Sequence, residues 1–286
     1  MIRMPQSATA AWLALVIGAA VSLPSRADVV AADHLDIELV SERDALVSGE
    51  RAWLGLRLRH APHWHSYWIN PGDSGLPTKL TWTLPTGYHA GAIAWPAPTR
   101  FPVSGLHNFG YGGDMLLPVA IEVPADAAVG GMAAFAVEAK WLVCREECVP
   151  GKATLQLALP IVRGDAAASF DAPRFVATRH AWPQAAAWTA TARRVGERIS
   201  ITLRGADLPE TKSLDAFAVQ RRVLDNAPPI FHRQDDALLI DAASSDYLDE
   251  LPATLDLVLT NGSADAWQLR VAFDQVPSAS TRSPSE

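Results

Sequence analysis

The sequence predicts an all-β protein built as a sandwich or a barrel, and two observations support that prediction. Apolar and polar residues alternate along many short segments, which is the period of half-buried strands, as in 35–40, 53–59 and 154–159. Clusters of turn-forming residues separate these segments, as in 70–73, 85–87, 110–114 and 129–131. Many short strands at this spacing are typical of a β-sandwich or a barrel.

The N-terminal residues 1–27 have the composition of a secretory signal peptide. Arg3 supplies a basic start, residues 10–21 form an apolar run, and Ser25-Arg26-Ala27 places small residues at the usual cleavage spacing. The run is shorter than the roughly 20 apolar residues that span a bilayer, and no later stretch reaches that length. We expect cleavage near Ala27 and export to a periplasm or an equivalent oxidising space, with an uncleaved anchor as the alternative.

The mature chain of 259 residues (286 − 27) exceeds the usual length of one domain. A shift in composition at 163–173 predicts a linker, in which a helical turn is only weakly indicated. Alternation resumes after it, and a second sandwich without cysteine is the simplest account. We therefore expect a first sandwich, a linker, a second sandwich and a disordered tail over residues 28–163, 164–180, 181–275 and 276–286.

The charge balance argues against two classes of partner. Without the leader, 22 basic residues stand against 31 acidic ones, which gives a formal charge of 22 − 31 = −9. Nucleic acids and anionic membrane surfaces attract basic proteins, so neither is an expected partner.

Cys144 and Cys148 are the only two cysteines in the chain. Exported domains that use disulfides as scaffolding usually carry several, whereas one closely spaced pair suits a dithiol redox centre. On one extended strand their Cα atoms would lie about 13 Å apart, but a disulfide tolerates only roughly 4.4–6.8 Å. We expect a hairpin with the loop 145–147, since the flanking residues favour strands over a helical turn.

Three roles for the cysteine pair remain open from spacing and compartment alone. A redox pair is the favoured role, and a structural staple and a metal site are the alternatives. The staple would be modest, because closing a loop of about five residues contributes roughly 2 kcal/mol in the chain-entropy model. Arg145 would favour a thiolate while Glu146 and Glu147 would oppose it.

Several motifs resemble one known family. They are 64–78 (WHSYWINPGDSGLPT), 95–102 (WPAPTRFP), 109–111 (FGY), 116–119 (LLPV) and 141–151 (WLVCREECVPG). Together they resemble the N-terminal periplasmic domain of the DsbD thiol:disulfide interchange family over most of 33–162. The likeness is greatest to the ScsB-like branch, whose periplasmic portion has two immunoglobulin-like domains. The resemblance therefore implies two immunoglobulin-like β-sandwiches.

The resemblance also implies a function, which is a thiol–disulfide relay without a cofactor. In this family a membrane-embedded domain passes electrons from cytoplasmic thioredoxin to a thioredoxin-like domain. That domain reduces the N-terminal domain, which in turn reduces periplasmic thioredoxin-fold proteins such as disulfide isomerases and cytochrome c maturation thioredoxins. Cys144 and Cys148 would form the redox pair, with Cys148 in the mixed disulfide. An aromatic cap loop would lie near 101–111, with Phe101, Phe109 and Tyr111 as candidates.

This sequence departs from the family in two respects. The best-known DsbD N-terminal domain has a wider cysteine spacing, so its acid–base neighbours cannot be placed by register. The sequence to Glu286 also contains neither the membrane domain nor the thioredoxin-like domain. We expect either a piece of a larger protein or a stand-alone module of a protein-disulfide reductase system, reduced by a membrane donor of the DsbD/ScsB type.

The competing hypothesis is a non-catalytic copper-tolerance or metal-binding protein with a structural disulfide. His63 and His65 would point to the same face if both lay on a strand, and His107 or a thiolate could complete a metal site. Most histidines in exposed turns bind no metal, so we expect neither a metal nor a cofactor.

Overall fold

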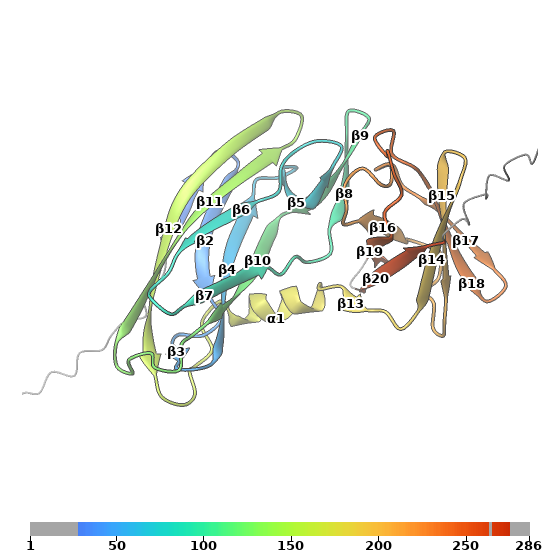
Figure 1. Cartoon of the computed structure of the whole chain (residues 1–286). Coiled ribbons are helices and arrows are strands. Elements are labelled where there is room, and N and C mark those ends of the chain that lie inside the picture. The colour runs from blue at the N-terminus through green and yellow to red at the C-terminus, as the bar shows by residue number, and fades with distance from the viewer. Residues whose placement is uncertain (1–27, 263–264, 275–286) are drawn as a thin grey trace, which may run out of the picture.

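The computed structural model of the chain describes residues 28–262 and 265–274 (Figure 1). The expected signal peptide at 1–27 and the expected tail at 276–286 lie outside the described residues. Strands dominate, as the alternating segments predicted, and they form three sheets in the described part of the chain. None of the helices described there could cross a membrane.

The first sheet is antiparallel and has the strand order β1-β2-β4-β10-β7. Its strands are β1 (Val30–Ala32), β2 (Leu35–Ser41), β4 (Arg51–His60), β10 (Asp114–Glu122) and β7 (His89–Ile93).

The second sheet has the order β3-β12-β11-β5-β9-β8, and β6 pairs with β11. Its strands are β3 (Leu46–Val47), β12 (Cys148–Val162), β11 (Met132–Cys144), β5 (His65–Gly72), β9 (Leu106–Gly112), β8 (Thr99–Val103) and β6 (Lys79–Thr83). We call the body formed by β1 to β12 the first sandwich. Its two sheets meet in one core, where Leu39 and Leu56 of the first sheet are buried with Phe135 and Leu157 of the second.

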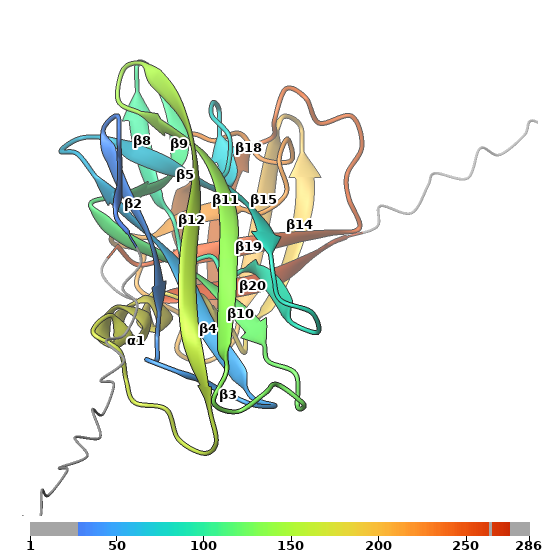
Figure 2. The ribbon, with the colours of Figure 1, turned by 90° about the vertical axis from the view of Figure 1, so that its left-hand side faces the viewer.

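Strands β11 and β12 form a long hairpin at the surface of the first sandwich (Figure 2). Their connecting turn lies at the same end of the sandwich as the turn between β8 and β9 (Figures 1 and 2). This end holds the two cysteines, since β11 finishes at Cys144 and β12 starts at Cys148.

The expected linker at 164–180 contains a helix, α1 (Ala172–His180), that packs on the first sandwich. Phe175 is 1% exposed and lies in a small apolar cluster with Val40, Leu116 and Trp53. Arg179 at the end of the helix makes a two-point ion pair with Glu42, at 2.7 and 2.5 Å. Much of the linker is therefore an ordered part of the first body and not an extended connection.

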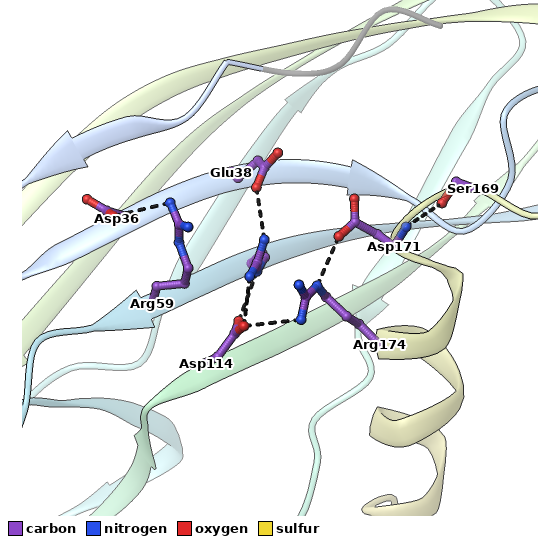
Figure 3. A network of polar contacts seen from close by, with 8 residues as sticks. Asp36, Glu38, Arg59, Asp114, Ser169, Asp171 and Arg174 are labelled. Atoms are coloured by element: carbon purple, nitrogen blue, oxygen red, sulfur yellow. Dashed lines mark hydrogen bonds and ion pairs between the residues drawn. The ribbon is translucent and has the colours of Figure 1, made fainter.

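A polar network joins α1 to the first sheet (Figure 3). Arg57, whose side chain is 8% exposed, donates to Asp114 at 2.9 and 2.7 Å and to Glu38 at 3.4 Å. Arg174 of α1 contacts Asp114 at 3.1 Å and Asp171 at 3.0 Å. The hydrogen bond from Arg57 lowers the pKa of Asp114 below its ordinary value, so this carboxylate stays ionised and holds both arginines.

The third sheet has the order β16-β19-β20-β14-β15-β18-β17, and β13 pairs with β20. We call it the second sandwich. Its strands are β16 (Asp215–Ala218), β19 (Thr254–Thr260), β20 (Ala266–Phe273), β14 (Thr189–Val195), β15 (Arg198–Arg204), β18 (Ala237–Ala243), β17 (Ile230–Gln234) and β13 (Gln184–Ala185). Ile240 of β18 and Leu257 of β19 share one core although several strands separate them in the sheet. The sheet therefore folds over on itself and encloses this second core.

Candidate redox site

The predicted hairpin is present between the two cysteines. Cys144 and Cys148 are directly opposite each other in the β11–β12 pair, and a disulfide joins them with Cα atoms 4.2 Å apart. The predicted loop 145–147 connects them, and the amide of Arg145 donates to the carbonyl of Glu147 at 3.1 Å. The strand-forming residues on both sides of the loop make this hairpin, which brings the two cysteines within the Cα distance that a disulfide requires.

The two cysteines differ in burial. Cys144 is 2% exposed, because it lies inside the sheet between Cys148 on one side and His65 of β5 on the other. Cys148 is the first residue of β12, far from the β3 pairing at the other end of that strand, and is exposed. A partner protein that approaches this end of the sandwich therefore meets Cys148 first.

His65 lies opposite Cys144 and is 1% exposed. Ser74 donates to Oδ1 of Asn108 from both its amide and its hydroxyl, at 3.2 and 2.9 Å. The Asn108 Nδ2 group therefore faces His65 Nε2, 3.5 Å away, as the donor, and the imidazole proton is on Nδ1. Burial, with a smaller effect of nearby His60, lowers the pKa of His65 to about 4, so the ring is neutral at pH 7.

Tyr67 is on the same face of β5 as His65 and is fully buried. Its hydroxyl oxygen lies 3.5 Å from Cys148 Sγ, and the hydroxyl is the donor because a disulfide sulfur carries no proton. Burial raises the pKa of Tyr67, which keeps the hydroxyl protonated. Gly75 makes room for this ring: a Cβ there would lie 2.2 Å from the Tyr67 Cε1 and Cζ atoms.

The three candidates for an aromatic cap occupy different places. Phe101 stacks on His65 with ring centroids 4.6 Å apart and an interplanar angle of 8°. Phe109 is 2% exposed and meets Phe217 of the second sandwich edge to face at 5.0 Å. Tyr111 is 4% exposed and donates its hydroxyl to the carbonyl of Pro96 at 2.7 Å. Of the three, Phe101 is the ring that lies against a neighbour of the disulfide.

The expectation that His63 and His65 share a strand face is wrong. Strand β5 begins at His65, and His63 is exposed in the preceding turn with a φ of 69°, which lies outside the β region. Over residues 28–262 and 265–274, no group of three or more His, Cys, Asp or Glu side chains could hold a metal ion.

Sequence reasoning missed Tyr67 as a neighbour of the disulfide and Asn108 as a neighbour of His65, and it assigned His65 only to a metal site. The period of two along β5 was a usable signal, since it places His65 and Tyr67 on one face. Nothing local indicated that this face meets the cysteine hairpin, because β5 and the hairpin are far apart in the chain.

Comparison with known proteins gives one family match and one solved structure of similar fold. The family model of the N-terminal domain of thiol:disulfide interchange protein DsbD matches residues 36–160. The N-terminal periplasmic domain of ScsB from Proteus mirabilis is similar in structure, with a TM-score of 0.66, 17% identity and coverage of 87% of this chain and 99% of that chain. This likeness confirms the predicted all-β, immunoglobulin-like fold.

Two further solved structures are much less similar. The tandem Ig repeats of Dlar have 14% identity and a TM-score of 0.24, covering 87% of this chain and 99% of that chain. Domains 5–6 of the S-layer protein SbsC have 8% identity and a TM-score of 0.23, covering 86% and 99%. TM-scores this low support no conclusion about the fold of this chain. In a separate comparison, no curated protein sequence matches the chain. The disulfide hairpin, His65 and Tyr67 all lie within the segment 36–160 that matches the family model of the DsbD N-terminal domain.

Proposed function

We propose that this chain is a periplasmic thiol–disulfide interchange module that passes two electrons to protein partners through Cys144 and Cys148. The observation that carries the proposal is the disulfide at a hairpin tip, with one buried and one exposed cysteine, inside a segment of the DsbD N-terminal family. A pair that only stapled the hairpin would need no such asymmetry.

The chemistry follows from the burial of the two sulfurs. In the reduced protein, the thiolate of exposed Cys148 attacks a disulfide of the partner and forms a mixed disulfide, releasing one partner sulfur as a thiolate. The sulfur of Cys144 then attacks Cys148 Sγ, which restores the internal disulfide and releases the second partner sulfur. The partner gains two electrons, and two protons move from the Cys144–Cys148 dithiol to the partner's dithiol, directly or through water.

Three neighbours of the pair have separate roles in this proposal. Tyr67 donates a hydrogen bond to the Cys148 sulfur, which favours its thiolate. His65 is neutral and packs beside Cys144, so it supplies no positive charge to the pair. Phe101 on His65 is the proposed cap on the Cys144 side of the pair, since Cys148 itself is exposed.

The proposed partners are periplasmic thioredoxin-fold proteins, of the disulfide isomerase or cytochrome c maturation type. A membrane donor of the DsbD/ScsB type would return electrons to the pair, either as a separate protein or as another part of a longer one. The family match of 36–160 supports this class of partner. Export through the leader at 1–27 would place the chain in their compartment.

Single-cysteine variants of the full chain test the proposal. Cys144→Ser leaves the exposed Cys148, and we expect it to trap a mixed disulfide with an oxidised thioredoxin-fold partner. Cys148→Ser leaves the buried Cys144 and should trap at least about tenfold less. Failure of both variants to trap a partner, together with a disulfide that resists physiological dithiols, would show that the bond is only a staple.

A further inference from the structure

The β8–β9 hairpin, which we call the cap hairpin, lies between the redox site and the second sandwich. Figure 1 shows it at the junction of the two bodies, beside β16. Successive side chains on a strand point to opposite faces. Phe101 of β8 therefore turns to His65 on one side, and Arg100 turns to the second sandwich on the other.

Arg100 is held by the second sandwich on several sides. Its Nε and Nη2 atoms donate to Asp215 at 2.9 and 2.5 Å, in the two-point geometry that suits a guanidinium and a carboxylate. Nη2 also donates to the carbonyl of Ala216 at 3.1 Å, and Nη1 donates to the carbonyl of Asn226. The Arg100 side chain is 8% exposed, so water screens these contacts little.

Aromatic rings complete the enclosure of the same guanidinium. Its Cζ atom lies 4.7 Å from the ring centre of Phe109 on the cap hairpin and 5.0 Å from that of Phe217 on β16. Phe217 is 1% exposed and belongs to the core of the first sandwich although it comes from the second. Arg100, the residue that precedes the cap ring in the chain, is therefore enclosed in the contact between the two bodies.

A second tie reaches the other strand of the cap hairpin. Asp73 accepts a hydrogen bond from the amide of His107 in β9 at 2.7 Å. Its other oxygen accepts one from Asn226 Nδ2 at 2.8 Å, and Asn226 also holds Arg100. Both strands of the hairpin are thus connected to one loop of the second sandwich.

An open cavity of about 450 Å³ lies beside the Arg100–Asp215 pair, with Thr99 and Phe217 in its lining. The packing between the hairpin and the second sandwich is incomplete here. The polar contacts of Arg100 and the Phe109–Phe217 ring contact attach the hairpin beside this cavity, which leaves the hairpin space to move.

We propose that Arg100 and Asp215 are positioning residues through which the second sandwich holds the cap hairpin closed over the redox site. When the pair separates, β8 is free to lift Phe101 from His65, and the disulfide becomes more accessible. This proposal rests on the function proposed above and assigns the second sandwich a part in it. The pair acts by setting the ratio of closed to open hairpin, and it takes no part in the sulfur chemistry.

The test uses the full-length oxidised chain with Asp215→Asn, which keeps the shape and loses the charge. Asp241→Asn is the matched control, because Asp241 pairs with Arg198 at 2.8 Å elsewhere in the second sandwich. The Asp215 and Asp241 side chains are similarly exposed, at 26% and 32%. Arg100→Lys is the second variant, because lysine keeps the charge but lacks the two-point geometry.

We expect amide hydrogen exchange in 99–112 and reduction of the disulfide by dithiothreitol both to be about five- to tenfold faster in Asp215→Asn. Arg100→Lys should have a smaller effect in the same direction, and Asp241→Asn should match the wild type. Unchanged exchange in 99–112 would overturn the proposal, as would equal acceleration in the control. Faster exchange without faster reduction would also overturn it, because the hairpin would then not limit access to the disulfide.

The two proposals fail in different experiments. Hydrogen exchange and reduction by dithiothreitol need no protein partner, so they report on the cap hairpin even if the chain traps no thioredoxin-fold protein. Loss of trapping in the single-cysteine variants would remove the relay and leave the hairpin result in place.

Discussion

The hydroxyl of Tyr67 donates a hydrogen bond to Cys148 Sγ across 3.5 Å, although 81 positions separate the two residues in the chain. Strand β5 makes this contact possible, because it pairs with β11 at Cys144 and so carries its own side chains to the cysteine hairpin. The exposed cysteine thus has a buried, protonated donor on its inner side and solvent on its outer side.

Replacing Tyr67 with phenylalanine removes the donor to Cys148 without removing the ring. A hydrogen bond to a charged group contributes about 1.5–3 kcal/mol, and part of that favours the thiolate. We expect alkylation of Cys148 by iodoacetamide in the reduced protein at pH 7 to slow by about fivefold. Tyr111→Phe is the control, because that hydroxyl donates to Pro96 instead. Equal rates in the two variants would mean that the Tyr67 hydroxyl does not act on the sulfur.

Gly75→Ala should displace the Tyr67 ring. Gly75 has a φ of +90°, and its added Cβ would lie 2.2 Å from two ring atoms. Gly105, at a φ of +84° in the turn of the cap hairpin, has no atom within 4 Å of the corresponding position and provides the matched control. We expect a loss of about 2–4 kcal/mol in the free energy of unfolding for Gly75→Ala and about 1 kcal/mol for Gly105→Ala, measured by chemical denaturation with the disulfide intact. Similar losses in the two variants would show that backbone strain, and not a clash with the Tyr67 ring, determines the loss of unfolding free energy.

Arg57→Ala should destabilise the protein much more than Arg59→Ala, although both residues lie on β4. Arg57 is 8% exposed and contacts Glu38, which is 3% exposed, so its removal leaves a buried carboxylate without this arginine. Arg59 and its partner Asp36 are 38% and 45% exposed. Thermal and chemical unfolding should give losses of about 3–5 kcal/mol for Arg57→Ala and below about 1 kcal/mol for Arg59→Ala. A loss for Arg57→Ala as small as that for Arg59→Ala would contradict this account of the network in Figure 3.

The stability of the protein should depend on pH partly through His65. The folded pKa of His65 is about 4, below the unfolded value of about 6.5. Between these values the unfolded chain binds a proton that the folded chain does not, so the contribution is complete above pH 6.5 and is lost as pH falls toward 4. Between pH 7 and pH 4 the free energy of unfolding should fall by about 2 kcal/mol less in His65→Gln than in the wild type, after allowance for partial screening by solvent.

Unfolding free energies measured from pH 7 to pH 4 check this prediction. The stability of His65→Gln should still depend on pH to some extent. Burial also lowers the pKa of His60, and the hydrogen bond from Arg57 lowers the pKa of Asp114. His63→Gln, in the exposed turn before β5, serves as the control. An equal slope in wild type and His65→Gln would show that the His65 ring is not protected from protonation.

The elements that the sequence predicted well are those whose geometry is local. The hairpin with the loop 145–147 follows from two cysteines four positions apart, which cannot bond on one extended strand, and from flanking residues that favour strands over a helical turn. Alternation likewise located β2, β4 and β12, since the period of two is a property of each strand by itself. His63 was misplaced because its positive φ belongs to a turn that the neighbouring strand residues do not reveal.

Helix α1 was only weakly indicated, and the reason is physical. It is short, and much of its attachment comes from Phe175 in the cluster with Leu116 and from the ion pairs of Arg174 and Arg179. Helices of this length are marginal by themselves, so the packing that stabilises this one lies outside its own sequence.

The choice among the three cap candidates also lay beyond sequence reasoning. Phe101, Phe109 and Tyr111 are all aromatic residues on two paired strands. Which ring reaches His65 depends on the register of β9 against β5, and that register shifts between Tyr67 and Gly72.

By itself the sequence determined an all-β chain, a cysteine pair at a hairpin tip and a segment with the motifs of a redox family. The tertiary structure decided which cysteine is buried, that Tyr67 faces Cys148, and that Arg100 holds Asp215 of the second sandwich. These contacts join residues 81 and 115 positions apart. Strand pairing and the packing of the two sandwiches create them, and no local period or spacing in the chain specifies such distant neighbours.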